Sequence, residues 1–265
     1  MASSHGFLEA AGELLAGLQR TQDAALDQAA DICADAIGGG GLVHAFGTGH
    51  SRIPVEELFP RYASFPGFHP IVELSMTFHT QVAGANGQRQ AMFIERTEGL
   101  AGEILRNFAL RERDAMLIFS ASGTTAVPIE MALGARAQGL RVIAVTSVEH
   151  SRAAAATHSS GTRLLDHADV VLDLCTPPGD GMVHIDGLDV PVGPGSTVAA
   201  AAIVNELKVR IARRLVARGQ MPPVITSAAV VGAERSRELF DAAYDEHARR
   251  AARVLRGSDG EPAAP

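Results

Sequence analysis

Residues 117–147, LIFSASGTTAVPIEMALGARAQGLRVIAVTS, decide the fold. They contain an apolar run, a cluster of Ser, Gly and Thr, a helical pattern that closes at Gly139, and a second apolar run. Each apolar run is typical of a buried strand. A strand, a helix and another strand in this order pair their strands in parallel. The stretch therefore predicts a parallel sheet with helices packed against it.

The alternation of strands and helices continues on both sides of this stretch. Strands are predicted at 41–46, 68–74, 114–122, 141–147 and 168–174. Helices are predicted at 7–37, 53–63, 91–110, 125–139 and 197–219. This order predicts a parallel sheet covered on both faces. Residues 176–196 form a Pro- and Gly-rich excursion that has room for a hairpin and is long enough to be a functional flap.

Composition indicates a cytoplasmic α/β protein with a large core. The chain has 265 residues, of which 46% are hydrophobic and 20% charged. The net charge of −7 argues against nucleic-acid and membrane-surface partners, which recruit basic faces. The two cysteines, Cys33 and Cys175, are far apart, so a disulfide framework is not expected. Neither a secretory signal nor a membrane span is expected from the apolar segments.

Two hydroxyl-rich turns follow predicted strands. They are GTGHSR at 47–52 and SASGTT at 120–125. One such turn alone is ordinarily a helix N-cap, but two at the strand ends of one parallel sheet predict a phosphate site. The candidate binding residues are Gly47, Thr48, Gly49, His50, Ser51, Ser120, Ser122, Gly123, Thr124 and Thr125. Neither turn has the lysine of a nucleoside triphosphatase loop, and the first lacks the third glycine of the dinucleotide fingerprint.

Three segments resemble the signatures of SIS (sugar isomerase) domains, which bind phosphorylated sugars. They are FGTGHSR at 46–52, IFSASGTT at 118–125 and GSTVAAAAIVNELK at 195–208, and the resemblance covers about residues 10–220. It implies a three-layer αβα sandwich with a five-stranded parallel, flavodoxin-like sheet. It also implies a phosphate held by the hydroxyls of 120–125, and a homodimer with sites near the subunit interface. Asn205 lies on the helix that often borders the site in these domains.

This resemblance divides the chain into four parts. We expect an N-terminal helical segment at 1–37, the SIS domain at 38–220, a C-terminal helical extension at 221–255 and a disordered tail at 256–265.

Residues 72–99 supply candidates for acid–base chemistry. Removing the proton at C2 of an open-chain aldose phosphate needs a base near neutrality, and burial raises the pKa of a carboxylate toward it. The candidates are Glu73, His79, Glu95 and Glu98. Glu73 follows an apolar run, where a solvated carboxylate is unusual. Glu95 and Glu98 share one face if their segment is helical, and they could equally form a solvated face.

A closer resemblance narrows the chemistry. ELSMTF at 73–78 and AGANGQRQAMFIERTEG at 83–99 are similar to the N-acetylmuramic acid 6-phosphate etherase branch, in which two glutamates form the acid/base pair. Glu73 matches the first, and Glu98 is favoured over Glu95 as the second. The whole chain resembles actinobacterial N-acetylglucosamine-6-phosphate dehydratases. It is therefore predicted to be a hydro-lyase: one glutamate takes the C2 proton, and the other protonates the departing 3-hydroxyl.

Three other functions stay open. An aldose–ketose isomerase would share the first proton transfer, an etherase would release lactate, and a non-catalytic sensor would only bind the sugar phosphate. The ten histidines include no helix-face pair with a third ligand in evident reach, so neither a metal nor an organic cofactor is expected. His158 and His167 are predicted to be surface residues. A zinc-dependent isomerase is a weaker alternative.

Overall fold

A five-stranded parallel sheet forms the centre of the computed structural model, which describes residues 6–77 and 88–255. Its order is β2-β1-β3-β4-β5, and every pair is parallel. The strands are β1 (Val43–Gly47), β2 (Phe68–Ile71), β3 (Ala115–Phe119), β4 (Arg141–Thr146) and β5 (Val170–Asp173). This doubly wound order confirms the predicted fold class and concentrates ligand-binding turns at the carboxyl edge.

The strands lie where apolar runs were predicted because both faces of the sheet are covered. Every residue of β1 and β3 is buried, as is usual for central strands of parallel sheets. Their register pairs Phe46 with Ile118 and Gly47 with Phe119. The turns that follow β1 and β3 therefore begin side by side.

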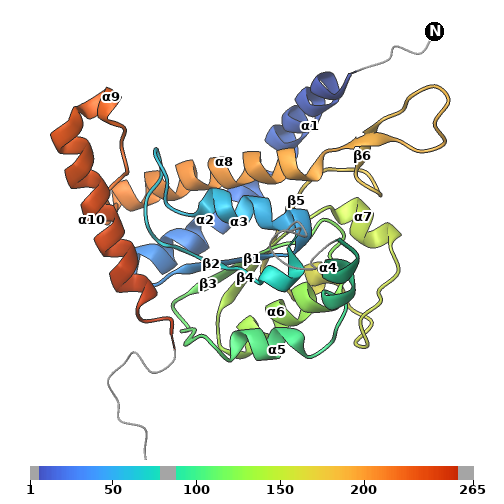
Figure 1. The fold of residues 1–265 in the computed structure, drawn as a ribbon, viewed down its shortest axis with the longest axis horizontal. Coiled ribbons are helices and arrows are strands. Elements are labelled where there is room, and N and C mark those ends of the chain that lie inside the picture. Colours follow the sequence, from blue (N-terminus) through green and yellow to red (C-terminus); the bar gives the residue numbers. More distant parts are fainter. Residues whose placement is uncertain (1–5, 78–87, 256–265) are drawn as a thin grey trace, which may run out of the picture.

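Helices cover the two faces of the sheet as separate layers (Figure 1). One layer holds α1 (Phe7–Thr21), α2 (Asp23–Gly38), α3 (Ile53–Leu58) and α8 (Ser196–Ala217). The other holds α4 (Gln88–Ile94), α5 (Leu100–Leu105) and α6 (Ala126–Ala137). Each layer has its own cluster of buried apolar side chains against the sheet. None of the described helices is long and apolar enough to cross a membrane.

A ladder of charges joins α2 to α8. Acidic residues recur every fourth position on α2, and arginines do so on α8. Arg210 pairs with Asp23 and Asp27, and Arg214 pairs with Asp27 and Asp31. Arg218 then pairs with Asp35. The two helices thus run parallel, with buried apolar residues beneath the ladder.

The C-terminal helices are α9 (Ala228–Val231) and α10 (Ala233–Ala251). In Figure 1, α10 stands at the edge of the sheet opposite α7 (Val148–Ala153). Arg250 anchors it, because its Nη1 donates to the carbonyls of Ile37 and Gly41 at 2.8 Å each. The predicted tail at 256–265 lies outside the described residues.

The excursion at 176–196 contains the expected hairpin, formed by β6 (Gly181–Val183) and β7 (Val192–Pro194). Asp180 closes its base onto α8. The Asp180 carboxylate accepts hydrogen bonds from the amides of Gly195 and Ser196 at 3.2 and 2.8 Å, and from Ser196 Oγ at 2.5 Å.

The helical pattern predicted at 7–37 forms two helices, α1 and α2, separated at Gln22. The side-chain oxygen of Gln22 accepts a hydrogen bond from the Asp173 amide at the end of the sheet. The predicted helix at 53–63 ends at Leu58, because the residue before Pro60 disfavours helical backbone. The short helix α7 was not predicted.

The predicted continuous helix at 91–110 is wrong. α4 ends at Ile94, and α5 begins at Leu100 and ends at Leu105. Gly99 separates them with a φ of +89°, a left-handed conformation that favours glycine. The Glu130 carboxylate accepts from the Gly99 amide at 2.8 and 2.9 Å and so stabilises the break.

Candidate functional site

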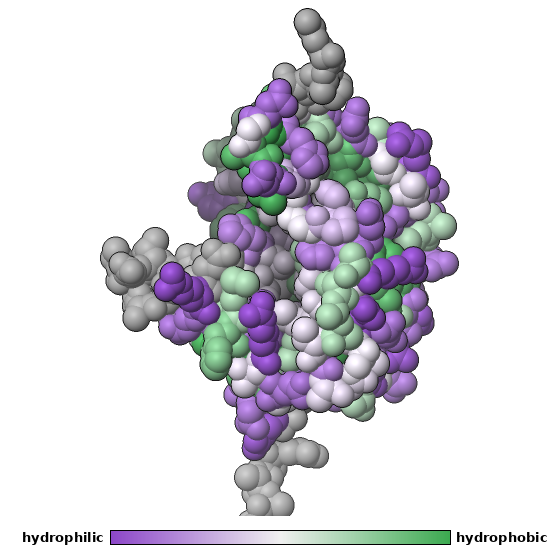
Figure 2. Space-filling model, turned by 90° about the vertical axis from the view of Figure 1, so that its right-hand side faces the viewer, coloured by the Kyte–Doolittle hydropathy of each residue, from purple (hydrophilic) through white to green (hydrophobic). Residues whose placement is uncertain are grey.

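The two hydroxyl-rich turns and the start of α8 meet at the carboxyl edge of the sheet. A cavity of about 20 Å³ lies between them. Its lining comprises His50, Ser51, Pro54, Phe119, Ser120, Ala121, Val145, Leu174, Ser196, Thr197 and Ala200. This volume has room for about one water molecule, so the cavity is the floor of a site rather than a pocket for a whole sugar. Figure 2 shows this side of the molecule, where hydrophilic and hydrophobic side chains intermix.

The first turn is shaped by Gly47 and Gly49. A Cβ added at Gly47 would lie 2.1 Å from the Ser51 carbonyl oxygen, so the chain can fold back here only without a side chain. Gly49 has a φ of +55°. His50 is exposed and Ser51 half-buried, and both line the cavity. Thr48 is buried, and its hydroxyl donates to Glu95 Oε2 at 2.7 Å.

The second turn is a compact loop at the start of α6. The Gly123 amide donates to Ser120 Oγ at 3.1 Å, and Thr124 Oγ1 donates to Ser122 Oγ at 3.1 Å. Gly123 has a φ of +62°, and a Cβ there would lie 2.9 Å from Thr146 Oγ1. Thr125 is the N-cap residue of α6, yet its side chain accepts no capping bond from that helix's described amides. Capping therefore does not account for the hydroxyl of Thr125.

Glu95 is the candidate carboxylate that the structure brings to the turns. It is half-buried, and its backbone oxygen accepts from the Val127 amide of α6 at 3.0 Å. Burial raises the pKa of its carboxyl, while the hydrogen bond from Thr48 and the charge of Arg96 act in the opposite direction. A carboxylate with a raised pKa and a fixed orientation is suited to accept a proton near neutrality.

Glu73 follows β2, the strand that pairs with β1 on the side opposite β3. Its side chain is half-buried, and burial raises the pKa of its carboxyl. Two candidates of the predicted acid–base set, Glu73 and Glu95, thus have the direction of pKa shift that the chemistry requires. His79 lies outside the described residues.

Glu98 lies elsewhere. Because residues 95–99 are not helical, Glu95 and Glu98 do not share a helix face as expected. The Glu98 carboxylate accepts from the amide and the hydroxyl of Ser159 at 2.7 and 2.6 Å, and these bonds lower its pKa. A lowered pKa and an exposed position do not suit a general base beside the two turns.

Asn205 also lies away from the cavity. It is exposed in the middle of α8, and its Nδ2 donates to the Ala201 carbonyl one turn earlier at 3.0 Å. The part of α8 that reaches the cavity is its beginning, Ser196 and Thr197. Neither of these two was chosen from the sequence, although the GPGST stretch before a helical pattern is a signal for a helix start at a site.

The expectation that His158 is a surface residue is wrong. Its side chain is only 7% exposed, because the loop that carries it folds back against α6. Thr157 beside it donates through Oγ1 to the Thr124 carbonyl at 2.8 Å. This loop therefore supports the second turn from behind.

Comparisons with known proteins identify the family of the chain. The family model of the SIS domain matches residues 6–147, which include most of the predicted N-terminal segment 1–37. A UPF0309 protein of Streptomyces coelicolor is 35% identical over 226 residues, covering 85% of this chain and 88% of that protein. A UPF0309 protein of Halalkalibacterium halodurans is 33% identical, covering 83% and 89%.

Solved structures of phosphoheptose isomerases are more distant. The enzyme of Neisseria gonorrhoeae gives a TM-score of 0.48 at 15% identity and covers 76% of this chain and 92% of its own. That of Francisella tularensis gives 0.49 at 16% identity, covering 78% and 95%. The names of the UPF0309 relatives state no reaction, so the finer resemblance to dehydratases and etherases stays a prediction. The family model and the curated relatives together show that the chain belongs to the SIS domain family, among the UPF0309 proteins.

Proposed function

We propose that the protein is an enzyme that removes the C2 proton of a phosphorylated amino sugar, with Glu95 as the base. One observation carries this proposal. The Glu95 carboxylate is hydrogen-bonded to Thr48 in the first turn, and its backbone is bonded to the start of α6, which the second turn opens. The glutamate thus contacts the first turn and the helix that follows the second, which supports its proposed position beside the bound sugar phosphate.

The second turn is the proposed phosphate site. The beginning of a helix attracts anions through its free amides and the helix dipole. Ser120, Ser122 and Thr125 add hydroxyls at the same place. Because the cavity beneath the turns is small, the sugar would lie across its mouth, toward Glu95.

The proposed reaction is dehydration of an N-acetylhexosamine 6-phosphate, N-acetylglucosamine 6-phosphate in the first instance. Glu95 takes the C2 proton of the open-chain aldehyde, and the electron pair forms the C1–C2 enolate. A second acid protonates the 3-hydroxyl, which leaves as water while the C2–C3 double bond forms and the C1 carbonyl is restored. Glu73 is proposed as that acid, because burial favours its protonated form.

An aldose–ketose isomerase is the second candidate. It needs a single base that moves a proton from C2 to C1, and Glu95, which is bonded to Thr48 of the first turn, would be that base. The first step is common to both reactions, so the products separate them.

The decisive assay incubates the protein with N-acetylglucosamine 6-phosphate and follows the products by mass spectrometry and ultraviolet absorbance. Loss of one water with a conjugated absorbance supports the dehydratase, whereas a ketose of unchanged mass supports the isomerase. Glu95→Gln is expected to bind the sugar phosphate and to lose about 10²–10⁴-fold in turnover. The matched control is Glu103→Gln, an exposed glutamate on α5 that pairs with Arg106.

Two outcomes contradict the proposal. Wild-type turnover in Glu95→Gln would remove Glu95 as the base. Saturable binding across a panel of hexose and hexosamine 6-phosphates without any turnover would identify a sensor.

A homodimer with sites near its interface is proposed alongside this activity. Leu8 and Leu15 of α1 are large apolar side chains with exposures of 86% and 40%, which is consistent with a partner on this helix. Light scattering after size-exclusion chromatography tests it, and a monomer mass at micromolar concentration would refute it.

A further inference from the structure

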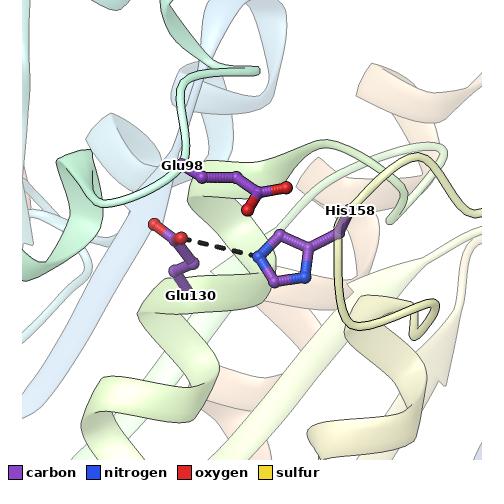
Figure 3. Close-up of side chains that lie close together, drawn as sticks. All are labelled: Glu98, Glu130 and His158. Carbon is purple, nitrogen blue, oxygen red and sulfur yellow. Dashed lines mark hydrogen bonds and ion pairs between the residues drawn. The ribbon is translucent and has the colours of Figure 1, made fainter.

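A second group of ionisable side chains lies beside α6, and none of its members lines the cavity. Glu98, Glu130 and His158 point toward one another from three separate segments (Figure 3). One potential ligand atom from each lies within 4.8 Å of the others. Within residues 6–77 and 88–255, no other trio of His, Cys, Asp or Glu side chains meets this criterion. None of the three residues is needed for the reaction proposed above.

Hydrogen bonds at Nδ1 hold the imidazole of His158. Its Nδ1 lies 2.7 Å from Ser160 Oγ and accepts from the Ser160 amide at 3.2 Å, and its Nε2 faces Glu130 Oε1 at 3.5 Å. The hydrogen-bond chain continues from Ser160 Oγ to Thr162 Oγ1 at 2.6 Å and to His167 Nε2 at 2.7 Å. Binding an ion through Nε2 requires the tautomer in which Nδ1 carries the proton and donates it to Ser160 Oγ, in place of the bond from the Ser160 amide. A hydrogen bond donated by the other ring nitrogen is what fixes the orientation of a metal-binding histidine. The nearly complete burial of His158 adds to this fixed orientation.

The two carboxylates are also held by backbone groups. Glu98 accepts from the Ser159 amide and hydroxyl, and Glu130 accepts from the Gly99 amide through both oxygens. Each oxygen keeps a further lone pair for another partner. Among the described residues, no lysine or arginine forms an ion pair with either glutamate, and their cationic partner is His158, when it is protonated. Ionised carboxylates whose oxygens lie within 4.8 Å of each other repel, unless a cation lies between them.

We propose that Glu98, Glu130 and His158 bind a divalent transition-metal ion of the zinc class. The ligands would be His158 Nε2 and one oxygen of each carboxylate. A nitrogen with two oxygens suits zinc, whereas magnesium and calcium prefer oxygen alone. Zinc–ligand distances of about 2.0–2.2 Å require the three atoms to close in slightly, which side-chain rotation can supply.

The ion would join three segments that contact the two turns. Glu98 belongs to the segment that carries Glu95, and Glu130 belongs to α6, which begins at the second turn. His158 adjoins Thr157, which is bonded to Thr124 of that turn. Binding therefore stabilises the folded protein, and this effect does not depend on whether the proposed reaction occurs.

The test uses the full chain after dialysis against a chelator. Titration with ZnCl2 by calorimetry should show one saturable site per chain, and Zn²⁺ should raise the midpoint of thermal unfolding. CoCl2 should give the visible absorption of a tetrahedral site. Glu130→Gln and His158→Gln should each weaken binding by about 10–100-fold or more. His184→Gln, at an exposed histidine next to β6, is the matched control and should bind as the wild type does.

Three results would overturn the site: no saturable Zn²⁺ binding, wild-type affinity in both ligand variants, or an equal loss in His184→Gln. Circular dichroism shows whether Glu130→Gln and His158→Gln fold without metal. If they do not, Glu98→Gln tests the site instead, since the exposed Glu98 side chain tolerates the change. Loss of the Co²⁺ absorption in Glu98→Gln supports the site, and retention overturns it.

Discussion

At the scale of single residues, the protonation of Glu95 depends on opposing influences. Burial favours the neutral acid, while the hydroxyl of Thr48 and the charge of Arg96 favour the anion. The sequence made Glu95 a candidate, and the resemblance to the etherase branch favoured Glu98 over it. The sequence alone does not reveal the bond from Thr48, which lies 47 positions away, or the end of α4 at Ile94, which leaves both glutamates outside a helix.

Thr48→Val should shift the pH dependence of the proposed activity. Removing the hydroxyl leaves burial as the main influence, so the pKa of Glu95 rises further above its ordinary value. The anion is the active base, and the acid limb of the kcat/KM profile should therefore move to higher pH. Thr97→Val, at an exposed threonine of the same segment, should leave the limb in place. An unshifted limb in Thr48→Val would show that this bond does not tune the base.

At the scale of elements, strands were easier to predict than helices. Each strand of the sheet is an apolar run of sufficient length, and the glycines mark where the following turns begin. Helix ends were harder, because distant partners decide them. Gln22, between α1 and α2, is bonded through its side chain to the Asp173 amide, and Gly99, between α4 and α5, is held by Glu130. The two hydroxyl-rich turns could be predicted because each is a short contiguous motif. The start of α8 is distant in the sequence and reaches the cavity only in the folded chain.

Gly47→Ala should damage the first turn. The new Cβ would meet the Ser51 carbonyl oxygen at 2.1 Å, so the backbone must move. We expect a loss of about 1–3 kcal/mol in the free energy of unfolding, as for other overpacked sites, together with weaker sugar-phosphate binding. Urea titration measures the first and calorimetry the second. Gly12→Ala on α1 is the control: a Cβ there meets nothing within 4 Å, so stability should hold or rise.

Asp180→Ala should loosen the hairpin. The carboxylate receives three hydrogen bonds at the start of α8, so its loss resembles removal of a helix cap and should cost about 0.5–2 kcal/mol. Hydrogen exchange should accelerate in 181–196. Asp186→Ala, on the exposed tip of the same hairpin, should exchange as the wild type does. Equal protection in both variants would show that the hairpin is held by other contacts.

At the scale of the whole molecule, the two edges of the sheet have different chemistry. The carboxyl edge carries hydroxyls and glycines. The amino edge carries a buried ionisable group: His44 Nδ1 lies 3.0 Å from His69 Nδ1, and His44 Nε2 lies 3.3 Å from Asp114 Oδ2. This cluster of three residues could not be predicted from the local sequence, because its members come from β1, β2 and the residue before β3.

Acid should destabilise the protein through His69. Burial, together with the charges of His44 and His247, lowers its pKa to about 4. In the unfolded chain the pKa of a histidine is about 6.5. The unfolded state therefore binds the proton first, so stability is complete above pH of about 6.5 and falls as the pH drops toward 4. The loss is up to about 3 kcal/mol. Urea titrations from pH 7.5 to 4.5 should show this slope, and His69→Gln should flatten it relative to His184→Gln. Parallel slopes in the two variants would assign the acid sensitivity to other groups.

The charge ladder between α2 and α8 has a consequence for folding accuracy. Aspartates and arginines both repeat at four-residue intervals, so sliding one helix by a single turn would re-form most contacts with neighbouring partners. Coulomb attraction alone consequently discriminates poorly between the native alignment and its slipped versions. The small side chains beneath, Ala30, Cys33 and Ala34, are fully buried and leave no slack for displacement. Steric fit, and not charge, selects the alignment.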